Sequence, residues 1–277
     1  MAKLRLISLL LIAVLSSRPV RADDALTAEA IMARVATNQD SSEKLRNQYI
    51  YHQHVQVSCK KPSGKVLREE TADYHVVPKP DHTERTLEQL TGRYWHKGKY
   101  QAFSGEPVPE ADSTDGELVN DFREDVTDEK SKDGLAHDLF PLTTDEQRQY
   151  KFRLIDHEPF EGRQAYHVAF TPKDDDNTDW AGEAYIDGQE FQPIYVFTKL
   201  SQPLPFGVRK FLGTDLPGLG FAVHYRRQDD GVWFPSSLGS EFRIRALFLF
   251  NRVMTVSLEN KDFERTHVET KITGADQ

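Results

Sequence analysis

Cysteine is nearly absent from this sequence. Cys59 is the only one among 277 residues, so no disulfide can form within the chain and a disulfide framework is excluded. We expect Cys59 to be a small, buried apolar residue at the end of a strand. The alternative is a reactive thiol with a depressed pKa, for which only the neighbouring Lys60 and Lys61 give a reason.

The short motifs that mark common enzymes are also missing. The chain has no Gly-x-Ser-x-Gly elbow, no His-Glu-x-x-His zinc motif, no phosphate-binding loop and no dinucleotide-binding glycine pattern. Gly218-Leu-Gly220 is an isolated Gly-x-Gly that leads into a strand, where it indicates a bulge or a turn. Acidic residues are so frequent that no catalytic pair of carboxylates stands out. We therefore predict no enzyme activity, no catalytic residues and no cofactor.

A calcium-binding loop is not supported either. The acidic run from Asp175 to Asp179 begins like an EF-hand loop. That loop needs glycine where Trp180 stands and glutamate where Ile186 stands, so the pattern fails twice. A solvated loop is the better interpretation of this segment.

A transition-metal site lacks ligands. His52 and His54 lie two residues apart on a predicted strand and therefore share one face. They would need a third ligand, such as His75 or His96, and two residues do not make a site. We predict no metal site in this chain.

Long apolar runs are missing except at the N-terminus, where residues 1–22 have the three parts of a secretion signal. Lys3 and Arg5 give a positive start, Leu6 to Leu15 form an apolar core, and a cleavage site ends at Ala22. This core is shorter than the roughly 20 residues that span a bilayer, which disfavours the alternative of an uncleaved membrane anchor. We expect cleavage after Ala22 and a mature, soluble chain in the periplasm or otherwise exported.

Basic residues are fewer than acidic residues in this sequence. The formal net charge is −9, and it becomes −13 without residues 1–22, which hold four basic residues and no acidic one. An acidic protein is repelled by nucleic acid and by anionic lipid headgroups. We therefore exclude nucleic acid as a partner.

What the sequence does have is alternation typical of β-strands. The segment from Trp180 to Phe197 reads as a hairpin: Asp187-Gly188 predicts the turn, with glycine at positive φ, and aromatic or β-branched residues fill both strands. Similar short strands recur from Gln48 onward and predict an antiparallel meander. Further turns are predicted at Gly64, Thr91-Gly92, Gly162 and Gly231. We expect a mainly β protein with one domain over residues 23–277.

Helices are expected at three places. Residues 25–35 carry apolar side chains near helical spacing, with Thr27 as a candidate N-cap. A helical insert at about 106–144 separates two blocks of strands, with helices predicted over residues 115–129 and 135–140. The last strand pair is predicted as Phe242 to Phe250 and Arg252 to Leu258, with its turn at Asn251.

Two strand segments are apolar at consecutive positions, so both faces of the sheet are apolar there. They are Ile194 to Phe197 and Ala246 to Phe250. In an antiparallel sheet one face commonly meets water and is polar. Either the sheet has a closed core, or it curls around an apolar cavity with helices as a lid. The candidate ligand-cavity residues form two alternating sets, of which one should line the cavity and the other the core: Phe197, Leu247 and Leu249, or their neighbours Val196 and Phe248.

Several motifs resemble a known family. They are Trp180-x-Gly182-x-x-x-Ile186-Asp187 followed by Pro193, then Gly231-Val-Trp-Phe-Pro235, and the closing Phe263-Glu-Arg265. This pattern, over about residues 145–272, resembles the periplasmic lipoprotein carriers of the LolA/LolB type and their RseB-like relatives. The resemblance implies an antiparallel open (half) β-barrel with capping helices around an apolar cavity, which binds acyl chains or a lipidated protein without catalysis.

Three functions follow as hypotheses. The first is an exported lipid- or lipoprotein-binding protein, such as an outer-membrane lipoprotein-sorting carrier. The second is an RseB-like envelope sensor or regulator that binds a protein partner through its acidic surface and the insert at about 106–144. The third is a hydrolase whose site the sequence does not reveal.

Overall fold

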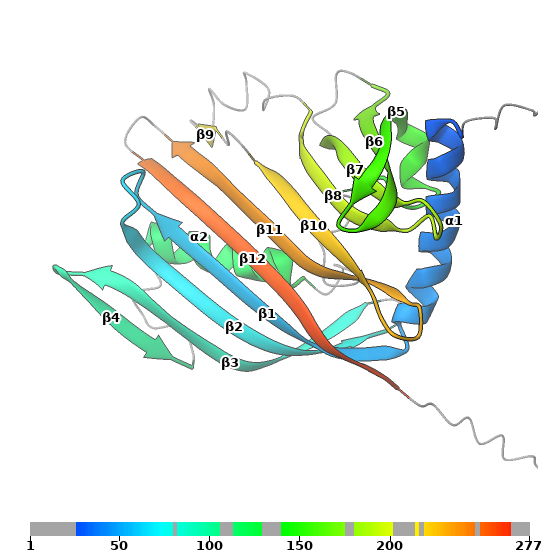
Figure 1. Ribbon diagram of the computed structural model, residues 1–277. Coiled ribbons are helices and arrows are strands. Elements are labelled where there is room, and N and C mark those ends of the chain that lie inside the picture. The colour runs from blue at the N-terminus through cyan, green and yellow to red at the C-terminus, as the bar shows by residue number, and fades with distance from the viewer. Residues whose placement is uncertain are drawn as a thin grey trace, which may run out of the picture.

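One antiparallel sheet dominates the computed structural model (Figure 1). The structure describes residues 26–79, 82–105, 113–128, 140–174, 180–201, 214–215, 219–246 and 250–266. The predicted signal at residues 1–22 lies outside this part, and so do the acidic run 175–179 and three of the candidate cavity residues, Leu247, Phe248 and Leu249.

The strands follow the order β4-β3-β2-β1-β12-β11-β10-β8-β7-β6-β5. Each strand pairs antiparallel with its neighbours, and β4 and β5 stand at opposite edges, so the sheet is open and not closed into a barrel. The short β9 pairs with β11. The bounds are β1 Tyr49–Lys60, β2 Val66–Pro78, β3 Thr83–His96, β4 Lys99–Ser104, β5 Tyr150–Phe160, β6 Arg163–Pro172, β7 Trp180–Asp187, β8 Pro193–Leu200, β9 Thr214–Asp215, β10 Gly220–Arg227, β11 Trp233–Ala246 and β12 Phe250–Arg265.

Two meanders make up this sheet, as the predicted succession of hairpins requires. Strands β1 to β4 form one, and β5 to β12 form the other. The join between them is long-range: β12, near the C-terminal end, pairs with β1, so that Val57 lies opposite Val256. Both blocks therefore belong to one continuous sheet.

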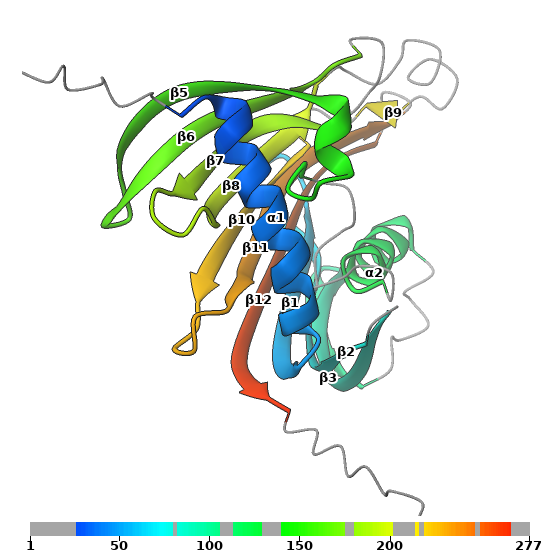
Figure 2. The same cartoon turned by 90° about the vertical axis from the view of Figure 1, so that its right-hand side faces the viewer.

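The core lies on one face of the sheet, which we call the inner face. A row of apolar residues crosses ten successive strands there, each paired with the next, and all but the first are buried. In order the row is Leu154, Val168, Ala184, Val196, Val223, Leu238, Leu258, Val55, Ala72 and Leu90. Both α-helices lie on this face (Figure 2).

Helix α1, Ala28–Arg46, is longer than the predicted 25–35. Its start is as predicted, because the Thr27 side chain accepts a hydrogen bond from the backbone N–H of Ala30. Its second half lacks an apolar stripe and is held by buried polar contacts. Gln39 donates to Gln192 at 2.5 Å, and Arg46 donates to the carbonyl oxygen of Trp233 at 3.3 Å. A periodicity search cannot detect such contacts, which explains the missed half.

Helix α2, Thr114–Val126, agrees with the predicted helix over 115–129 apart from its last turn. The Ser113 side chain caps it by accepting from the N–H of Gly116. Of the helix predicted over 135–140, only Phe140 lies within the described residues. A short 3-10 helix, η3 (Glu146–Gln149), precedes β5. None of the helices in the described part of the chain is long and apolar enough to cross a membrane.

Two predicted turns are wrong. Thr91-Gly92 lies inside the continuous strand β3, and the chain turns instead at Lys97 and Gly98, both at positive φ. Glycine is required at position 92 by packing and not by a turn, because a Cβ atom would collide with the ring of Phe103. Asn251 lies within β12, paired with Arg245.

The last strand pair also differs from the prediction. β11 runs from Trp233 to Ala246, so the predicted strand ending at Phe250 stops four residues earlier. β12 begins at Phe250, which pairs with Ala246. The apolar run from Ala246 to Phe250 is therefore not one two-sided strand, because its ends belong to two different strands.

Candidate functional site

The two described cavity candidates point in opposite directions. Val196 and Phe197 are neighbours on β8, and side chains alternate along a strand. Val196 is fully buried on the inner face, between Ala184 and Val223. Phe197 is 39% exposed on the outer face. The structure therefore does not bring these two residues into one site.

Phe197 borders a hollow on the outer face. Its volume is about 440 Å³, and Tyr195 shares its wall. The floor is made by small residues on successive strands, since Phe197 pairs with Ala222, Ala222 with Gly239, and Gly239 with Ser257. Small side chains beside two aromatic rings explain why the sheet is hollowed at this point.

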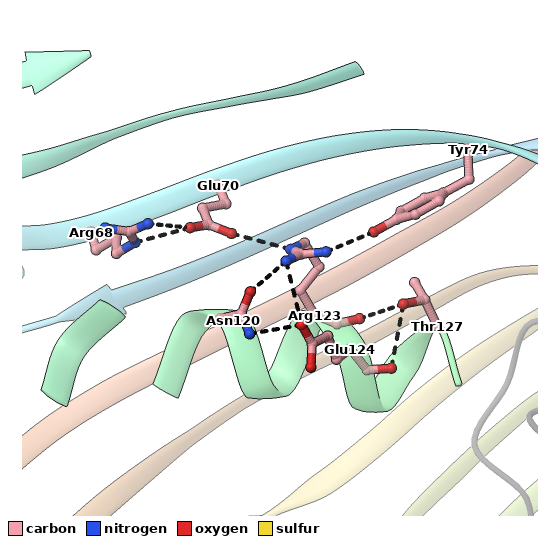
Figure 3. A network of polar contacts seen from close by, with 7 residues as sticks. All are labelled: Arg68, Glu70, Tyr74, Asn120, Arg123, Glu124 and Thr127. Atoms are coloured by element: carbon pink, nitrogen blue, oxygen red, sulfur yellow. Dashed lines mark hydrogen bonds and ion pairs between the residues drawn. The ribbon is translucent and has the colours of Figure 1, made fainter. Parts of the chain in front are cut away.

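A buried ionic cluster lies on the inner face, beneath helix α2 (Figure 3). Arg68 and Glu70 are two residues apart on β2 and share a face, and Arg123 reaches them from α2. Arg68 donates from Nε and Nη2 to Glu70 Oε1, at 2.9 and 2.6 Å. Arg123 donates from Nε to Glu70 Oε2 at 3.2 Å. One carboxylate thus serves two guanidinium groups.

Neutral groups complete the surroundings of this cluster. Arg123 donates to the Tyr74 hydroxyl at 3.0 Å and to the Asn120 amide oxygen at 2.5 Å. Burial alone would lower the pKa of Arg123, but the contacts with Tyr74 and Glu70 outweigh it and raise that pKa. The guanidinium of Arg68 lies 5.0 Å from the ring centre of Phe103 and 5.9 Å from that of Tyr94. All three charged residues are buried.

Two further polar contacts attach α2 to the sheet. At its N-terminal end, Arg252 on β12 donates to Asp115 at 2.6 and 3.3 Å. At its C-terminal end, Arg85 on β3 donates to the carbonyl oxygens of Thr127 and Asp128, at 3.1 and 2.8 Å. Fully buried apolar contact from α2 comes from Val119 and Val126. Between these polar contacts the helix also packs through its apolar side chains, with the ring of Phe122 5.0 Å from that of Phe242.

The single cysteine is not a reactive site. Cys59 is buried on β1, with its Sγ 3.5 Å from Asp115 Oδ1. Burial raises the pKa of its thiol to about 12, and the neighbouring Asp115 carboxylate adds to the rise. A thiol in this state is protonated at neutral pH, so the reactive alternative is wrong and the small buried residue is confirmed.

The histidines on β1 are paired with acids instead of with one another. His54 Nδ1 lies 2.6 Å from Asp73, and His52 Nδ1 lies 3.2 Å from Glu88. Within the described ranges, no group of three or more His, Cys, Asp or Glu side chains could hold a metal ion.

Sequence reasoning missed the cluster of Arg68, Glu70 and Arg123. A faint signal exists, because Arg68 and Glu70 share the face of Ala72 and Tyr74 in a strand with period-2 alternation. Charges at inward positions normally require a partner. That partner, Arg123, lies more than fifty residues away, so local patterns could not supply it.

Comparison with known proteins gives remote similarities. No protein-family model matches the chain, and no curated protein matches it in sequence. Among solved structures it is similar to a DUF1329 family protein from Desulfovibrio piger (12% identity, 88% of this chain and 95% of the other, TM-score 0.40). It is also similar to a LolA superfamily protein from Nitrosomonas europaea (14% identity, 91% of this chain and 99% of the other, TM-score 0.34). A third similar structure is an outer membrane lipoprotein-sorting protein domain from Vibrio parahaemolyticus (11% identity, 88% of this chain and 94% of the other, TM-score 0.36).

Two of these structures bear the names of the family that the hairpin motifs resemble. The identities are low and the TM-scores lie below 0.5. What the chain binds has to be argued from its own residues.

Proposed function

We propose that this protein is an exported carrier that binds the acyl chain of a lipid or of a lipidated protein against the inner face of its sheet. The observation that carries the proposal is the apolar row across ten strands of an open sheet, with helices as its cover. An acyl chain binds through apolar burial, at about 0.8 kcal/mol per methylene, and needs no catalytic group.

The attachment of α2 supports an entry route between this helix and the sheet. Asp115 and Arg252, which hold its N-terminal end, are each about one-fifth exposed. Hydrogen bonds to a charged group contribute about 1.5–3 kcal/mol, and water reaches this pair and can replace them when it opens. Burial of a few methylenes therefore offsets the loss of this pair. In the proposed carrier, the N-terminal end of α2 moves away from β1 and β12 and an acyl chain enters beneath it, while Arg123 and Arg85 keep the C-terminal end attached.

Export is part of the proposal and rests on residues 1–22. Cleavage after Ala22 should leave a mature chain that begins at Asp23. N-terminal sequencing of material recovered from the periplasm or the medium tests this. Full-length chain in the membrane fraction would contradict it.

The binding proposal is tested by locking α2. Because Cys59 Sγ lies 3.5 Å from the Asp115 carboxylate, the variant Asp115→Cys places two thiols side by side on β1 and α2. We expect the wild-type protein to bind a fluorescent fatty acid, oxidised Asp115→Cys to bind it far less, and reduction to restore binding. The double variant Cys59→Ala/Asp115→Cys is the matched control, since it cannot form the disulfide.

Two results would contradict the proposal. The first is a wild-type protein that carries no copurified lipid in native mass spectrometry and takes up no fluorescent fatty acid. The second is equal uptake by the oxidised and the reduced Asp115→Cys variant, once a thiol assay shows that the disulfide has formed.

A second candidate function is the capture of a partner protein, and the hollow beside Phe197 favours it. An exposed aromatic residue at a hollow of about 440 Å³ is suited to a protruding apolar side chain of a partner. We expect Phe197→Ser to abolish retention of any partner that delipidated protein holds in envelope extracts. Leu87→Ser, at another exposed apolar residue, is the control. Equal retention by both variants would contradict this function.

A further inference from the structure

The buried cluster on the inner face holds more positive than negative charge. Arg68 and Arg123 contribute two guanidinium groups, and Glu70 contributes the one buried carboxylate. Glu124 lies 3.9 Å from Arg123, but it is 64% exposed and belongs to the solvent side of α2. The Asp115–Arg252 pair is separate and balanced within itself. The positive charge at the Arg68 end of the cluster therefore has only a shared carboxylate to balance it.

Arg68 also has an unused hydrogen-bond donor. Its side chain is 1% exposed, and its Nη1 is buried with no hydrogen-bond partner. Its other two nitrogens both donate to the same oxygen of Glu70. Burial of a charged donor without a partner is costly, and native proteins rarely leave one unpaired. A bound anion would remove this cost.

Arg68 is not needed to hold the helix. The residue that joins α2 to the cluster is Arg123, which contacts Glu70 and Tyr74 on β2. The contacts of Arg68 are with Glu70 on its own strand and with the rings of Tyr94 and Phe103 on β3 and β4. None of these contacts uses Nη1 or reaches α2 directly.

We propose that Arg68 binds the carboxylate of a fatty acid, through Nη1, when the acyl chain occupies the inner face. This inference rests on the proposed function and specifies the ligand class as a free fatty acid. A carboxylate carries one negative charge, which matches the one uncompensated guanidinium. The rings of Tyr94 and Phe103 and the apolar row supply the surface along which a chain attached to that carboxylate is buried.

The experiment compares ligands that differ only at the head group. Delipidated mature protein is titrated with hexadecanoate, hexadecanol and hexadecyl phosphate, in the wild type and in Arg68→Met, which removes the charge and keeps an apolar stem. Arg93→Met is the matched control: Arg93 on β3 pairs with Glu69 on β2 at 2.5 Å, next to the cluster in sequence, but its side chain is 47% exposed. We expect Arg68→Met to weaken hexadecanoate binding about tenfold or more. The affinity of Arg68→Met for hexadecanol should differ from that of the wild type by less than about twofold, and so should the affinity of Arg93→Met for hexadecanoate.

Glu70→Gln provides a test in the opposite direction. It removes the carboxylate that competes for Arg68, so hexadecanoate should bind more tightly to this variant than to the wild type. A purely structural cluster requires that Arg68→Met and Glu70→Gln both weaken binding of every ligand. Circular dichroism checks that each variant is folded. If Glu70→Gln does not fold, the comparison of Arg68→Met with Arg93→Met is the deciding test of the carboxylate site.

The outcomes separate the two proposals. Equal binding of hexadecanoate and hexadecanol, unaffected by Arg68→Met, overturns the carboxylate site and leaves the carrier function standing. Arg68-dependent binding that is tighter for hexadecyl phosphate overturns the carboxylate in favour of a phosphate head group. Binding of none of the three ligands by the wild type overturns the carrier function itself.

Discussion

At the residue scale, two glycines of the sheet, on β7 and β11, have opposite roles. Gly182 on β7 leaves no room for a side chain, since a Cβ atom would collide with the carbonyl oxygen of Phe197 and lie 2.8 Å from Cζ of Phe170. At Gly239 on β11, an added Cβ atom would meet open space. The first glycine is required by packing and the second is not.

The pair gives a matched test. Gly182→Ala forces backbone to move and should lower the free energy of unfolding by about 1–3 kcal/mol. Gly239→Ala should leave it unchanged or raise it by about 0.4–1 kcal/mol, because alanine reduces the freedom of the unfolded chain. Urea denaturation of both variants measures the difference. A Gly182→Ala variant as stable as the wild type would show that β7 and β8 are packed less tightly than described.

At the element scale, the turn between β7 and β8 depends on one aspartate. Asp187 Oδ1 accepts from the N–H groups of Gln189 and Glu190, at 2.9 and 2.7 Å, and Oδ2 accepts from Arg163 at 2.6 Å. The hairpin and its turn are as predicted. The positive φ is not, because it falls on Phe191 and not on Gly188.

These contacts predict acid sensitivity. Burial alone would raise the pKa of Asp187, but the N–H of Glu190, Arg163 and the N–H of Gln189 outweigh it and hold that pKa below its ordinary value. A lowered folded-state pKa gives stability that is present above the unfolded pKa of about 3.9 and is lost as the pH falls towards the folded value. The stability advantage of wild type over Asp187→Asn should therefore shrink from about pH 6 to about pH 3.

Thermal or urea unfolding across this pH range measures the effect. The control is Asp145→Asn, at a side chain that is 86% exposed, where the difference from wild type should stay small and constant. An advantage over Asp187→Asn that is the same at both ends of the range would contradict the role of the charge.

At the scale of the whole molecule, the sheet divides neighbouring residues of β8 between a core and a surface. Val196→Trp adds bulk in the middle of the apolar row and should lower the free energy of unfolding by about 1–3 kcal/mol. Phe197→Trp on the outer face should change it by less than about 0.5 kcal/mol. Unfolding midpoints and fluorescent fatty acid binding, measured on both variants, test the two faces together.

The outcome also decides whether the inner face is a closed core or a cavity. Loss of fatty acid binding in Val196→Trp without loss of stability would mean that the row lines a space open to ligand. Loss of stability on both faces would contradict the assignment of Phe197 to the surface and of its hollow to the solvent side.

The sequence by itself determined the local structure. Period-2 alternation identified most of the strands, because residues on one face of a strand share one environment. Thr27 marked the start of α1, and the turns at Gly64, Gly162 and Gly231 coincide with glycines at positive φ. Such signals depend only on a residue and its near neighbours, so they can be read without the fold.

The tertiary structure alone decided the rest. Pairing of β1 with β12 joins the two blocks of strands, and the register of that pair fixes which face each residue takes. Alternation along β8 puts Val196 and Phe197 on opposite faces, and only the packed structure decides that the Val196 face is the covered one. The cluster of Arg68, Glu70 and Arg123 exists because α2 lies over β2. Contacts of this kind depend on distances between remote segments, and no local pattern records those distances.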